Sequence, residues 1–557
     1  MKNKNTFILL IILIIGFCFR LTGINWDQGQ HLHPDERFLT MVLTDIDISQ
    51  NFIQYLNPQT STLNPYNQGY SFFVYGSFPL NLVKVLGELF GLKSYDQIYI
   101  VGRFLTILLD TFIILLIYLI STKIFNPKIG LISALFYSIY VLPIQLAHFY
   151  TVDPFLNFFI ILTFYLLILL KNKSKIFLKI ILLSLVFGIA IACKISAIYF
   201  LPIIFIFFIY YFFQKPFIFL LSVIIFVFFT SFSLRLNQPQ IFSSGNILNW
   251  NLNPQFVENI LELKSYDNNP FYPPAIQWLK TIPLLFPLKN IIFWGLGLPL
   301  GLIFISSVLF SIYLLIKQNI LNQFYLSIIL FWIIFLIIFQ GIQSVTTMRY
   351  FLPIYPFIAI ISGLFVSKIL KKTKLSSKRL FLIALILLVF IYPLSFISIY
   401  FKDHSRVSAS KWIYQNIPAG STIATEYWDD ALPLSIGNSL SSLFQYKELP
   451  VADKEDELKM ENIISQVKQS DYLVLSSNRF YLPIPKNSDI FPNTAKYYQS
   501  LLDGSLGFTK VAEFTSYPCF PPIGKPLYCL NDTILAEEAF TVYDHPKVYI
   551  FKNNFSY

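Results

Sequence analysis

The sequence predicts an all-α membrane protein, a polytopic bundle of about eleven transmembrane helices with a soluble α/β domain at its C-terminal end. Three observations predict this class. Of the 557 residues, 55% are hydrophobic and only 13% are charged, whereas soluble domains carry roughly 25% charged residues. The hydrophobic residues gather in runs long enough to cross about 30 Å of hydrocarbon. From residue 402 onward, charged residues are spread throughout instead.

The first apolar run, 6–24, follows Lys2 and Lys4. It lacks a small-x-small cleavage site and is long enough to span, so we predict a retained anchor and not a removed signal peptide. The further runs are 99–123, 129–146, 155–170, 180–193, 197–213, 217–234, 291–316, 324–341, 350–366 and 380–401. The run 180–193 is the shortest, and an error there would invert the orientation of every later span.

The distribution of basic residues predicts the orientation, because short cytoplasmic loops carry an excess of Lys and Arg. With the N-terminus in the cytoplasm, the inner segments hold Lys2, Lys4, Lys123, Lys128, Lys171, Lys173, Lys175, Lys179, Lys215, Lys317, Lys368, Lys371, Lys372, Lys374, Lys378 and Arg379. The short outer junctions hold Lys194, Arg235 and Arg349. We therefore predict a multi-pass cell-membrane protein with segments 25–98, 237–290 and 402–557 on the outer side.

The outer segments differ in character. Residues 71–92 are apolar but interrupted by glycine and proline, which predicts a helix lying in the membrane interface. We divide the chain into a membrane domain, 1–401, and a soluble domain, 402–557. In the latter, 471–476 and 547–551 read as strands and alternate with segments rich in helix formers, such as 407–416 and 460–469.

Charge and cysteine content exclude some classes of function. The net charge of +11 comes mainly from lysines between apolar runs, so we expect no nucleic-acid partner. No two of the four cysteines form a CxxC pair, which disfavours a thiol-based metal or redox centre. Cys519 and Cys529 flank a turn-rich stretch of the outer domain, and we predict a disulfide between them.

The densest polar cluster, His31 to Arg37, follows the first span. One interpretation is a helix start, with Pro34 in the first turn and Asp35 and Glu36 near the helix N-terminus. The other is a catalytic site in which Asp35, with Glu36 beside it, is the general base toward an acceptor hydroxyl. His33 would then contact substrate. We expect no cofactor, although His31, His33 and Asp35 leave a divalent metal as an alternative.

Four further charged residues lie at predicted outer junctions. Asp153 in TVDP either caps a helix or belongs to the site. Arg103, Lys194 and Arg349 either extend to lipid headgroups or bind a phosphate. Asp110, inside the second span, either pairs with a neighbouring helix or joins the site.

These motifs resemble the polytopic glycosyltransferases of the C-type fold, in particular the polyprenyl- or dolichyl-phosphate-mannose-dependent mannosyltransferases of glycosyltransferase family 39 and the aminoarabinose transferases. The resemblance rests on HPDE at Asp35, the span with Arg103, TVDP at Asp153, CKISAIYFLP at Lys194 and RYFLPIYP at Arg349. It implies an inverting transfer of one sugar from a polyprenyl-phosphate donor to a lipid, glycan or protein acceptor on the outer face.

The resemblance also assigns roles. It implies that Asp35 is the base, that Asp153 is a second acidic site residue, and that Lys194 and Arg349 contact the donor phosphate. The soluble domain resembles the tails of bacterial members through TEYWDDALP and AEEAFTVYDHP. We expect the acidic residues of these two motifs to lie on the surface.

Two other functions compete with the enzyme. A transporter or flippase of a lipid-linked or envelope precursor also needs many spans and buried charges, but its polar residues are expected near the midplane. A membrane-anchored receptor or scaffold leaves unexplained why Asp35, Asp153, Lys194 and Arg349 fall on the same side.

Overall fold

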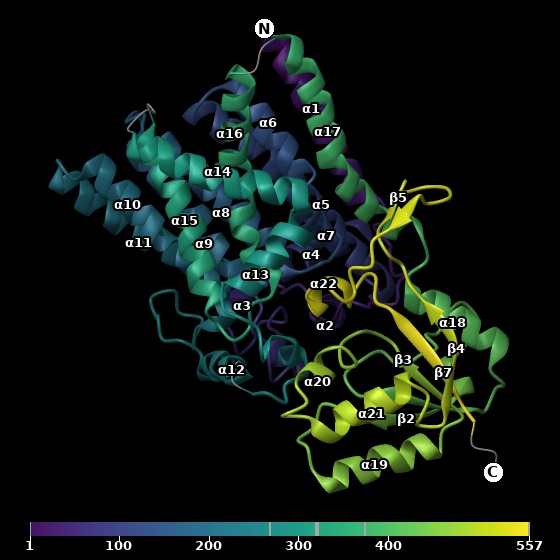
Figure 1. Cartoon of the computed structure of the whole chain (residues 1–557). Helices are drawn as coiled ribbons and strands as arrows, with labels where there is room; N and C mark the ends of the chain where they lie inside the picture. The colour runs from purple at the N-terminus through teal and green to yellow at the C-terminus, as the bar shows by residue number, and fades with distance from the viewer. Residues whose placement is uncertain (1, 267–268, 318–321, 373–374, 555–557) are drawn as a thin grey trace.

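The computed structural model describes residues 2–266, 269–317, 322–372 and 375–554. A helical bundle fills one half of the molecule and a domain built on a β-sheet fills the other (Figure 1). Ten described helices are long and apolar enough to cross a membrane, or up to eleven if a bent helix pair counts as one span. The predicted fold class is confirmed, and the chain is a multi-span membrane protein.

The spans agree with the apolar runs. They comprise α1 (Lys2–Leu21), α5 (Tyr95–Ile124), α6 (Pro127–Ser138) with α7 (Val141–Ala147), α8 (Val152–Leu169), α9 (Ile176–Cys193), η2 (Ile195–Phe200) with α10 (Leu201–Phe212), α11 (Pro216–Asn237), α14 (Leu298–Ile316), α15 (Gln323–Gly341), η7 (Met348–Ile354) with α16 (Tyr355–Lys372), and α17 (Leu375–Ile397). The short predicted span at 180–193 is a separate helix, α9. The bend of 59° between α6 and α7 precedes Pro143, which cannot donate to the carbonyl of Ile139.

One ion pair ties the first two long helices together inside the bundle. Arg20 Nε of α1 lies 2.5 Å from Asp110 Oδ2 of α5, and the Tyr137 hydroxyl donates to the other Asp110 oxygen at 2.6 Å. Arg20 and Asp110 are fully buried. Asp110 was expected either to pair with a neighbouring helix or to join the site, and it pairs with Arg20 of the neighbouring helix α1.

Between the spans lie shorter elements on the side of the bundle that faces the sheet domain. They are α2 (Pro34–Asp45), α3 (Phe52–Leu56), η1 (Pro65–Gln68), α4 (Ser77–Phe90), η3 (Pro239–Ile241), α12 (Pro254–Ser265), η5 (Pro273–Trp278), α13 (Leu285–Asn290) and η6 (Ile291–Gly295). Helix α4 corresponds to the predicted interface helix. With 14 residues it is too short to cross a bilayer, and it leaves Leu89 and Phe90 exposed.

The C-terminal part forms a five-stranded sheet in the order β2-β1-β3-β7-β4. Its strands are β1 (Thr422–Glu426), β2 (Gln445–Leu449), β3 (Tyr472–Leu475), β4 (Phe508–Phe514) and β7 (Val548–Asn553). Strand β1 is parallel to β2 and β3, whereas β7 is antiparallel to β3 and β4. The predicted strands at 471–476 and 547–551 are β3 and β7.

Helices accompany these strands, as predicted. They are η8 (Ser398–Phe401), α18 (Ser405–Asn416), η9 (Ser441–Leu443), α19 (Glu457–Lys468), α20 (Pro483–Lys486), α21 (Pro492–Leu502) and α22 (Glu538–Thr541). Two apolar cores lie on the two faces of the sheet, one on each face. The division of the chain at residue 401 stays a prediction.

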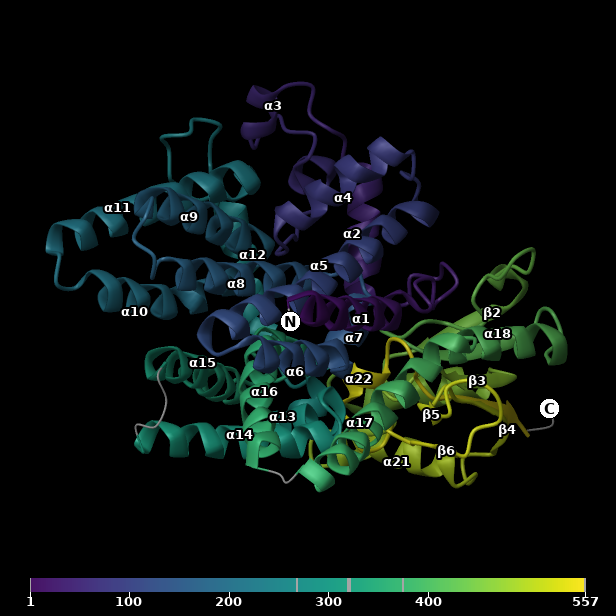
Figure 2. The same ribbon diagram turned by 90° about the horizontal axis from the view of Figure 1, so that it is seen from above.

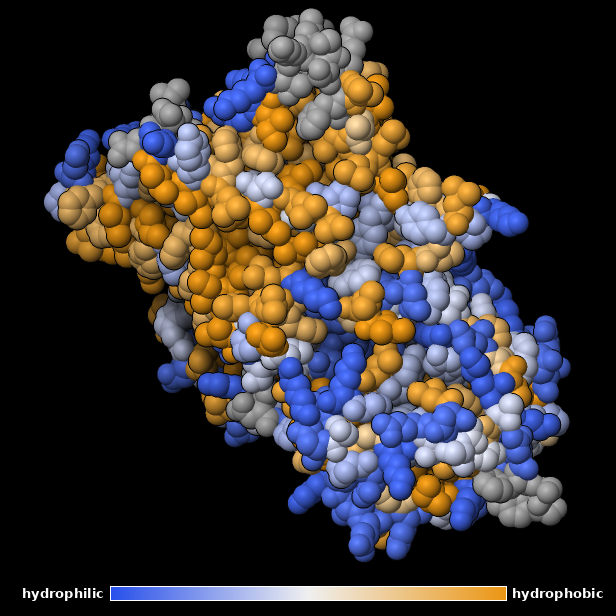
Figure 3. All heavy atoms as spheres, in the orientation of Figure 1, coloured by the Kyte–Doolittle hydropathy of each residue, from blue (hydrophilic) through white to orange (hydrophobic). Residues whose placement is uncertain are grey.

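The surface separates the two halves. On the face shown in Figure 3, hydrophobic residues cover most of the bundle, whereas hydrophilic residues cover most of the sheet domain. Helix α22 lies where the bundle meets this domain, close to α7 and α17 in both ribbon views (Figures 1 and 2). Its Phe540 is part of the bundle core, so the C-terminal segment packs into the membrane domain as well as into the sheet.

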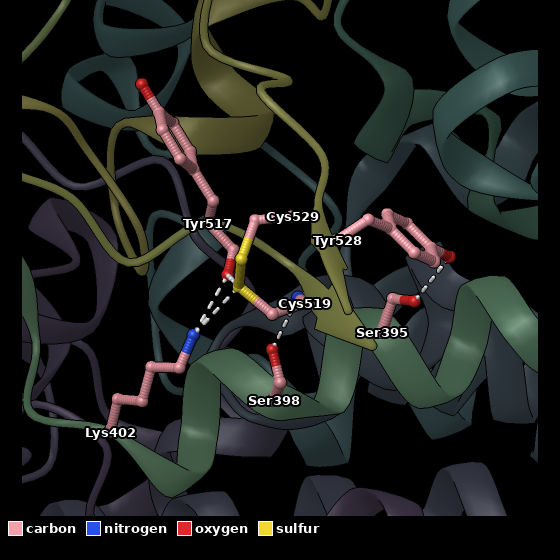
Figure 4. The surroundings of a disulfide bond; sticks show 7 residues. All are labelled: Ser395, Ser398, Lys402, Tyr517, Cys519, Tyr528 and Cys529. Atoms are coloured by element: carbon pink, nitrogen blue, oxygen red, sulfur yellow. Dashed lines mark hydrogen bonds between the residues drawn. A yellow bond between two sulfur atoms is a disulfide. The ribbon is translucent and has the colours of Figure 1, made fainter. Parts of the chain in front are cut away.

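The predicted disulfide between Cys519 and Cys529 is confirmed. The two cysteines lie on β5 (Cys519–Phe520) and β6 (Tyr528–Cys529), which pair as an antiparallel hairpin. The hairpin sits against the end of the last span: the Cys519 N–H donates to Ser398 Oγ at 2.8 Å, and Ser395 Oγ lies 3.0 Å from the Tyr528 hydroxyl (Figure 4). The crosslink therefore constrains the hairpin that contacts the end of the last span.

Replacing both cysteines, Cys519→Ala with Cys529→Ala, should lower the free energy of unfolding by about 2–3 kcal/mol, because the reduced loop regains freedom in the unfolded chain. Thermal unfolding in detergent measures this loss. The matched control is Cys18→Ala, which removes an exposed free thiol and should leave the midpoint unchanged. Complete alkylation of both thiols in native membranes without reductant would contradict the crosslink.

Candidate active site

Asp35 and Arg349 form the first charged pair of the site. Asp35 lies in the first turn of α2, which begins at Pro34 after the His33 cap. Arg349 lies in the first turn of η7, which starts the span ending with α16. The Arg349 guanidinium donates to Asp35 Oδ2. The Arg349 side chain is 25% exposed and the Asp35 side chain is 20% exposed, so a ligand can reach both.

Asp153 and Lys194 form the second pair. Asp153 lies in the first turn of α8, and Lys194 lies at the break between α9 and η2. Lys194 Nζ donates to Asp153 Oδ1 at 2.7 Å, and the lysine side chain is 26% exposed. Asp153 thus lies at a helix start, as one interpretation predicted, although its side chain makes no capping hydrogen bond. Its role in the site stays a prediction.

One aromatic ring joins the two pairs. Lys194 Nζ lies 4.6 Å from the centroid of the Tyr350 ring, and the Arg349 guanidinium carbon lies 5.5 Å from the same centroid. Cations at this range are attracted by the π-face. Asp35, Asp153, Lys194 and Arg349, which are far apart in the sequence, therefore meet around Tyr350.

The charges of the site fix the ionisation of Asp35. Burial alone would raise the pKa of this carboxyl, but Arg349, with His33 and Lys194, outweighs burial and lowers the pKa to about 2. Tyr75 hydrogen-bonds the same carboxylate, and burial together with the Asp35 charge raises the pKa of Tyr75 well above 10. At neutral pH Asp35 is an anion bound to a cation and to a neutral hydroxyl.

Glu36 and Arg103 do not line this site. Arg103 Nε donates to both Glu36 oxygens at 3.1 and 2.9 Å, and its Nη1 and Nη2 donate to Asp27 at 3.0 and 2.9 Å. All three side chains are 0% exposed. The roles predicted for Glu36 in catalysis and for Arg103 in substrate binding do not fit this structure. These residues instead anchor the first outer segment on α5.

His33 also serves the fold. Its Nδ1 accepts the backbone N–H of Glu36 at 3.4 Å, and its ring packs against Phe149 and Tyr543. It is 1% exposed, so the predicted contact with substrate does not fit either. Among the described residues, no group of three or more His, Cys, Asp or Glu side chains is placed to hold a metal ion. Independence from a cofactor stays a prediction.

The sequence analysis missed a contribution from the C-terminal segment. Glu537 accepts the Thr347 hydroxyl at 2.8 Å and the Met348 N–H at 3.0 Å, at the helix start that carries Arg349. Burial raises the pKa of Glu537 to about 7. The expectation that the acidic residues of AEEAFTVYDHP lie on the surface was wrong, since Glu537 and Glu538 are 3% and 6% exposed.

A buried histidine, His545, binds two carboxylates within the same C-terminal segment. His545 Nδ1 lies 2.5 Å from Asp544 Oδ1, and its Nε2 lies 3.0 Å from Asp532 Oδ2. Burial opposes a charge there, but the two carboxylates raise the pKa of His545 to about 10. Asp544 also accepts from Gln145 of α7 at 3.0 Å. A protonated His545 therefore holds together the contacts that join the segment to the bundle.

Part of the chain resembles a known family of proteins. Residues 88–234 match the family model described as dolichyl-phosphate-mannose-protein mannosyltransferase. The matched segment contains Arg103, Asp153 and Lys194. The predicted resemblance to these transferases is thereby confirmed over this part of the chain. A search of the curated proteins finds no match to the sequence.

Solved structures with a similar fold include the oligosaccharyltransferase AglB from Archaeoglobus fulgidus. Its complex with an inhibitory peptide and a dolichol-phosphate aligns with a TM-score of 0.54 at 13% identity, over 90% of this chain and 72% of that chain. The apo form of the Archaeoglobus fulgidus oligosaccharyltransferase aligns with a TM-score of 0.54 at 13% sequence identity, over 88% of this chain and 72% of that chain. ArnT from Cupriavidus metallidurans in the apo state aligns with a TM-score of 0.47 at 13% sequence identity, over 74% of this chain and 72% of that chain. The likeness to AglB shows that this chain has the fold of that polytopic transferase.

Arg103→Leu should lower the free energy of unfolding by about 3–5 kcal/mol, because it leaves two buried carboxylates without a counter-charge. The melting temperature in detergent measures the loss. The matched control is Lys280→Ala, because Lys280 pairs with Asp489 on the exposed surface and such pairs contribute about 0–1 kcal/mol. A folded Arg103→Leu protein with normal stability that failed only to bind donor would restore the substrate-binding role.

Proposed function

We propose that this protein is a membrane glycosyltransferase that transfers a sugar, with inversion, from a polyprenyl-phosphate-linked donor to an acceptor on the outer face. The observation that carries the proposal is the meeting of two carboxylate–cation pairs around Tyr350. The match to a dolichyl-phosphate-mannose-dependent family and the fold shared with AglB, solved with a dolichol-phosphate, support it.

The chemistry needs the two kinds of group that meet here. A phosphate leaves more readily when cations offset the charge that develops on its oxygens, and Arg349 and Lys194 supply two. An acceptor hydroxyl attacks more readily when a carboxylate takes its proton, and Asp35 supplies one. Attack on the face opposite the phosphate gives the inverted product. Asp153 holds Lys194 in place and is the second acidic residue of the site.

The ion pairs suggest how donor binding prepares the base. Without donor, Arg349 keeps Asp35 a weak base, since it lowers the pKa to about 2. A donor phosphate competes with Asp35 for Arg349, because guanidinium binds phosphate and carboxylate through the same donors. Once the phosphate has taken Arg349, burial is less opposed and the pKa of Asp35 rises. The carboxylate then becomes a stronger base when donor is present.

The location follows from the lysine distribution. We propose that the N-terminus lies in the cytoplasm and that the C-terminal domain lies outside, which puts the site at the outer membrane face. The donor is a polyprenyl-phosphate sugar held in the membrane, and the acceptor is a lipid, a glycan or a protein. Neither a nucleic acid nor a metal has a part in the proposed reaction.

The transporter or flippase alternative receives less support. A transporter places unpaired polar groups at the midplane on interrupted helices. Here Arg20 and Asp110, which are buried within the bundle, pair with each other, and the two ion pairs of the candidate site meet around Tyr350.

Asp35→Asn should reduce the transfer rate by about 10²–10⁴-fold, because it removes the basicity and keeps the size. The assay uses radiolabelled undecaprenyl-phosphate mannose and membranes from cells that lack the protein, which hold unmodified acceptor. Arg349→Ala should weaken the binding of undecaprenyl phosphate by roughly 10- to 100-fold, since hydrogen bonds to charged groups contribute about 1.5–3 kcal/mol.

The matched control is Asp489→Asn, which removes a carboxylate that is 60% exposed in the C-terminal domain and should leave both readouts unchanged. Near wild-type transfer by the Asp35→Asn protein would refute the proposed base. Unchanged lipid binding by the Arg349→Ala protein would refute the proposed phosphate contact.

A further inference from the structure

A group of aromatic rings, two of them exposed and two half-buried, lies where the C-terminal domain meets the segment 237–290. This aromatic cluster consists of Tyr266, Tyr272, Tyr427 and Trp428. Tyr272 stacks on Tyr266 with centroids 4.9 Å apart and meets Trp428 edge to face at 5.9 Å. Tyr427 meets Trp428 edge to face at 6.3 Å. Tyr427 and Trp428 are 52% and 51% exposed.

Trp428 has a backbone conformation that a tryptophan rarely adopts. Its φ is +81°, and strain of this kind costs about 1–3 kcal/mol and gathers at ligand sites. The loop is held on both sides of the residue: the Asp429 N–H donates to the Glu426 carbonyl at 3.2 Å, and Arg406 binds Asp429 at 2.6 Å. The fold thus holds the large Trp428 ring half exposed to solvent, where the ring adds little to the apolar core.

The aromatic cluster adjoins the candidate active site. Tyr272 lies within electrostatic range of Asp35 and Arg349. On the other side, Asp430 lies 2.5 Å from Arg37, two residues beyond Asp35 on α2. The loop that carries Trp428 is therefore tied to the helix that carries the proposed base.

We propose that the aromatic cluster binds a sugar ring of the acceptor, so that the acceptor is a saccharide chain whose end reaches Asp35. The inference rests on the proposed function, which it extends by naming the acceptor class. The C–H groups on one face of a pyranose ring carry a small positive charge and stack on the negative face of an aromatic ring. The ring hydroxyls stay free, and one of them is the nucleophile.

The charges around the cluster favour a neutral saccharide. Asp429 and Asp430 are held by Arg406, and Asp430 also by Arg37, so these two arginines are already paired with carboxylates. The two arginines and the two carboxylates cancel in charge, so this group does not attract the phosphates of anionic lipid headgroups. This argues against the other common use of exposed tryptophan and tyrosine, which is anchoring at the membrane interface.

The test measures saccharide binding by full-length protein in nanodiscs, using saturation-transfer NMR with mannotetraose and maltotetraose as probes and no lipid donor. Trp428→Gly removes the ring, and glycine adopts a positive φ without strain. It should weaken binding by about tenfold, equivalent to about 1.4 kcal/mol. Trp428→Phe keeps a ring and should retain most of the binding.

The matched control is Trp250→Ala, since Trp250 is 45% exposed but does not belong to the aromatic cluster, and its loss should not affect binding. Equal binding by the Trp428→Gly protein and the wild type would overturn the inference. Quenching of Trp428 fluorescence by brominated lipids, with no effect of either saccharide, would overturn it in favour of a membrane anchor.

The two proposals fail separately in these assays. Loss of saccharide binding in Trp428→Gly, with no binding of undecaprenyl phosphate to the wild type, would uphold the saccharide site and refute the lipid donor. Normal donor binding and transfer, with saccharide binding indifferent to Trp428, would refute the acceptor site alone.

Discussion

The position of the site depends on one buried cation, Arg103. Its guanidinium binds Asp27, after α1, and Glu36, on α2, and a charge so deeply buried is stable only when it is paired and hydrogen-bonded. These bonds fix the first turn of α2 on α5. Successive helix residues differ in direction by about 100°, so fixing Glu36 inward leaves Asp35 facing Arg349. Two adjacent carboxylates thereby acquire different roles.

A second constraint comes from the C-terminal domain. Glu537 caps the helix start that carries Arg349, and Asp430 binds Arg37 on the helix that carries Asp35. The domain thus contacts both helices of the exposed ion pair. It also brings Trp428 close to the site. On our proposal, the C-terminal domain therefore contributes both to the active site and to the choice of acceptor.

The sequence was sufficient for the fold class because the hydrophobic runs and the lysine pattern follow directly from bilayer thickness and insertion. It was also sufficient to bring out Asp35, Asp153, Lys194 and Arg349, since charges at membrane junctions are costly and few. It could not separate Asp35 from Glu36, because their difference depends on which way each faces on α2. The buried Glu537 was mistaken for a surface residue because its partner, the backbone at Met348, leaves no mark in the sequence.

The exchange of Arg349 between Asp35 and a donor phosphate is the central claim, and the affinity of undecaprenyl phosphate for the Asp35→Asn protein tests it most directly. If the carboxylate competes with the phosphate, its removal should tighten binding severalfold relative to wild type, although transfer is lost. Asp489→Asn controls for the change in net charge. Equal or weaker binding by the Asp35→Asn protein would contradict the exchange and leave the ion pair as a structural contact.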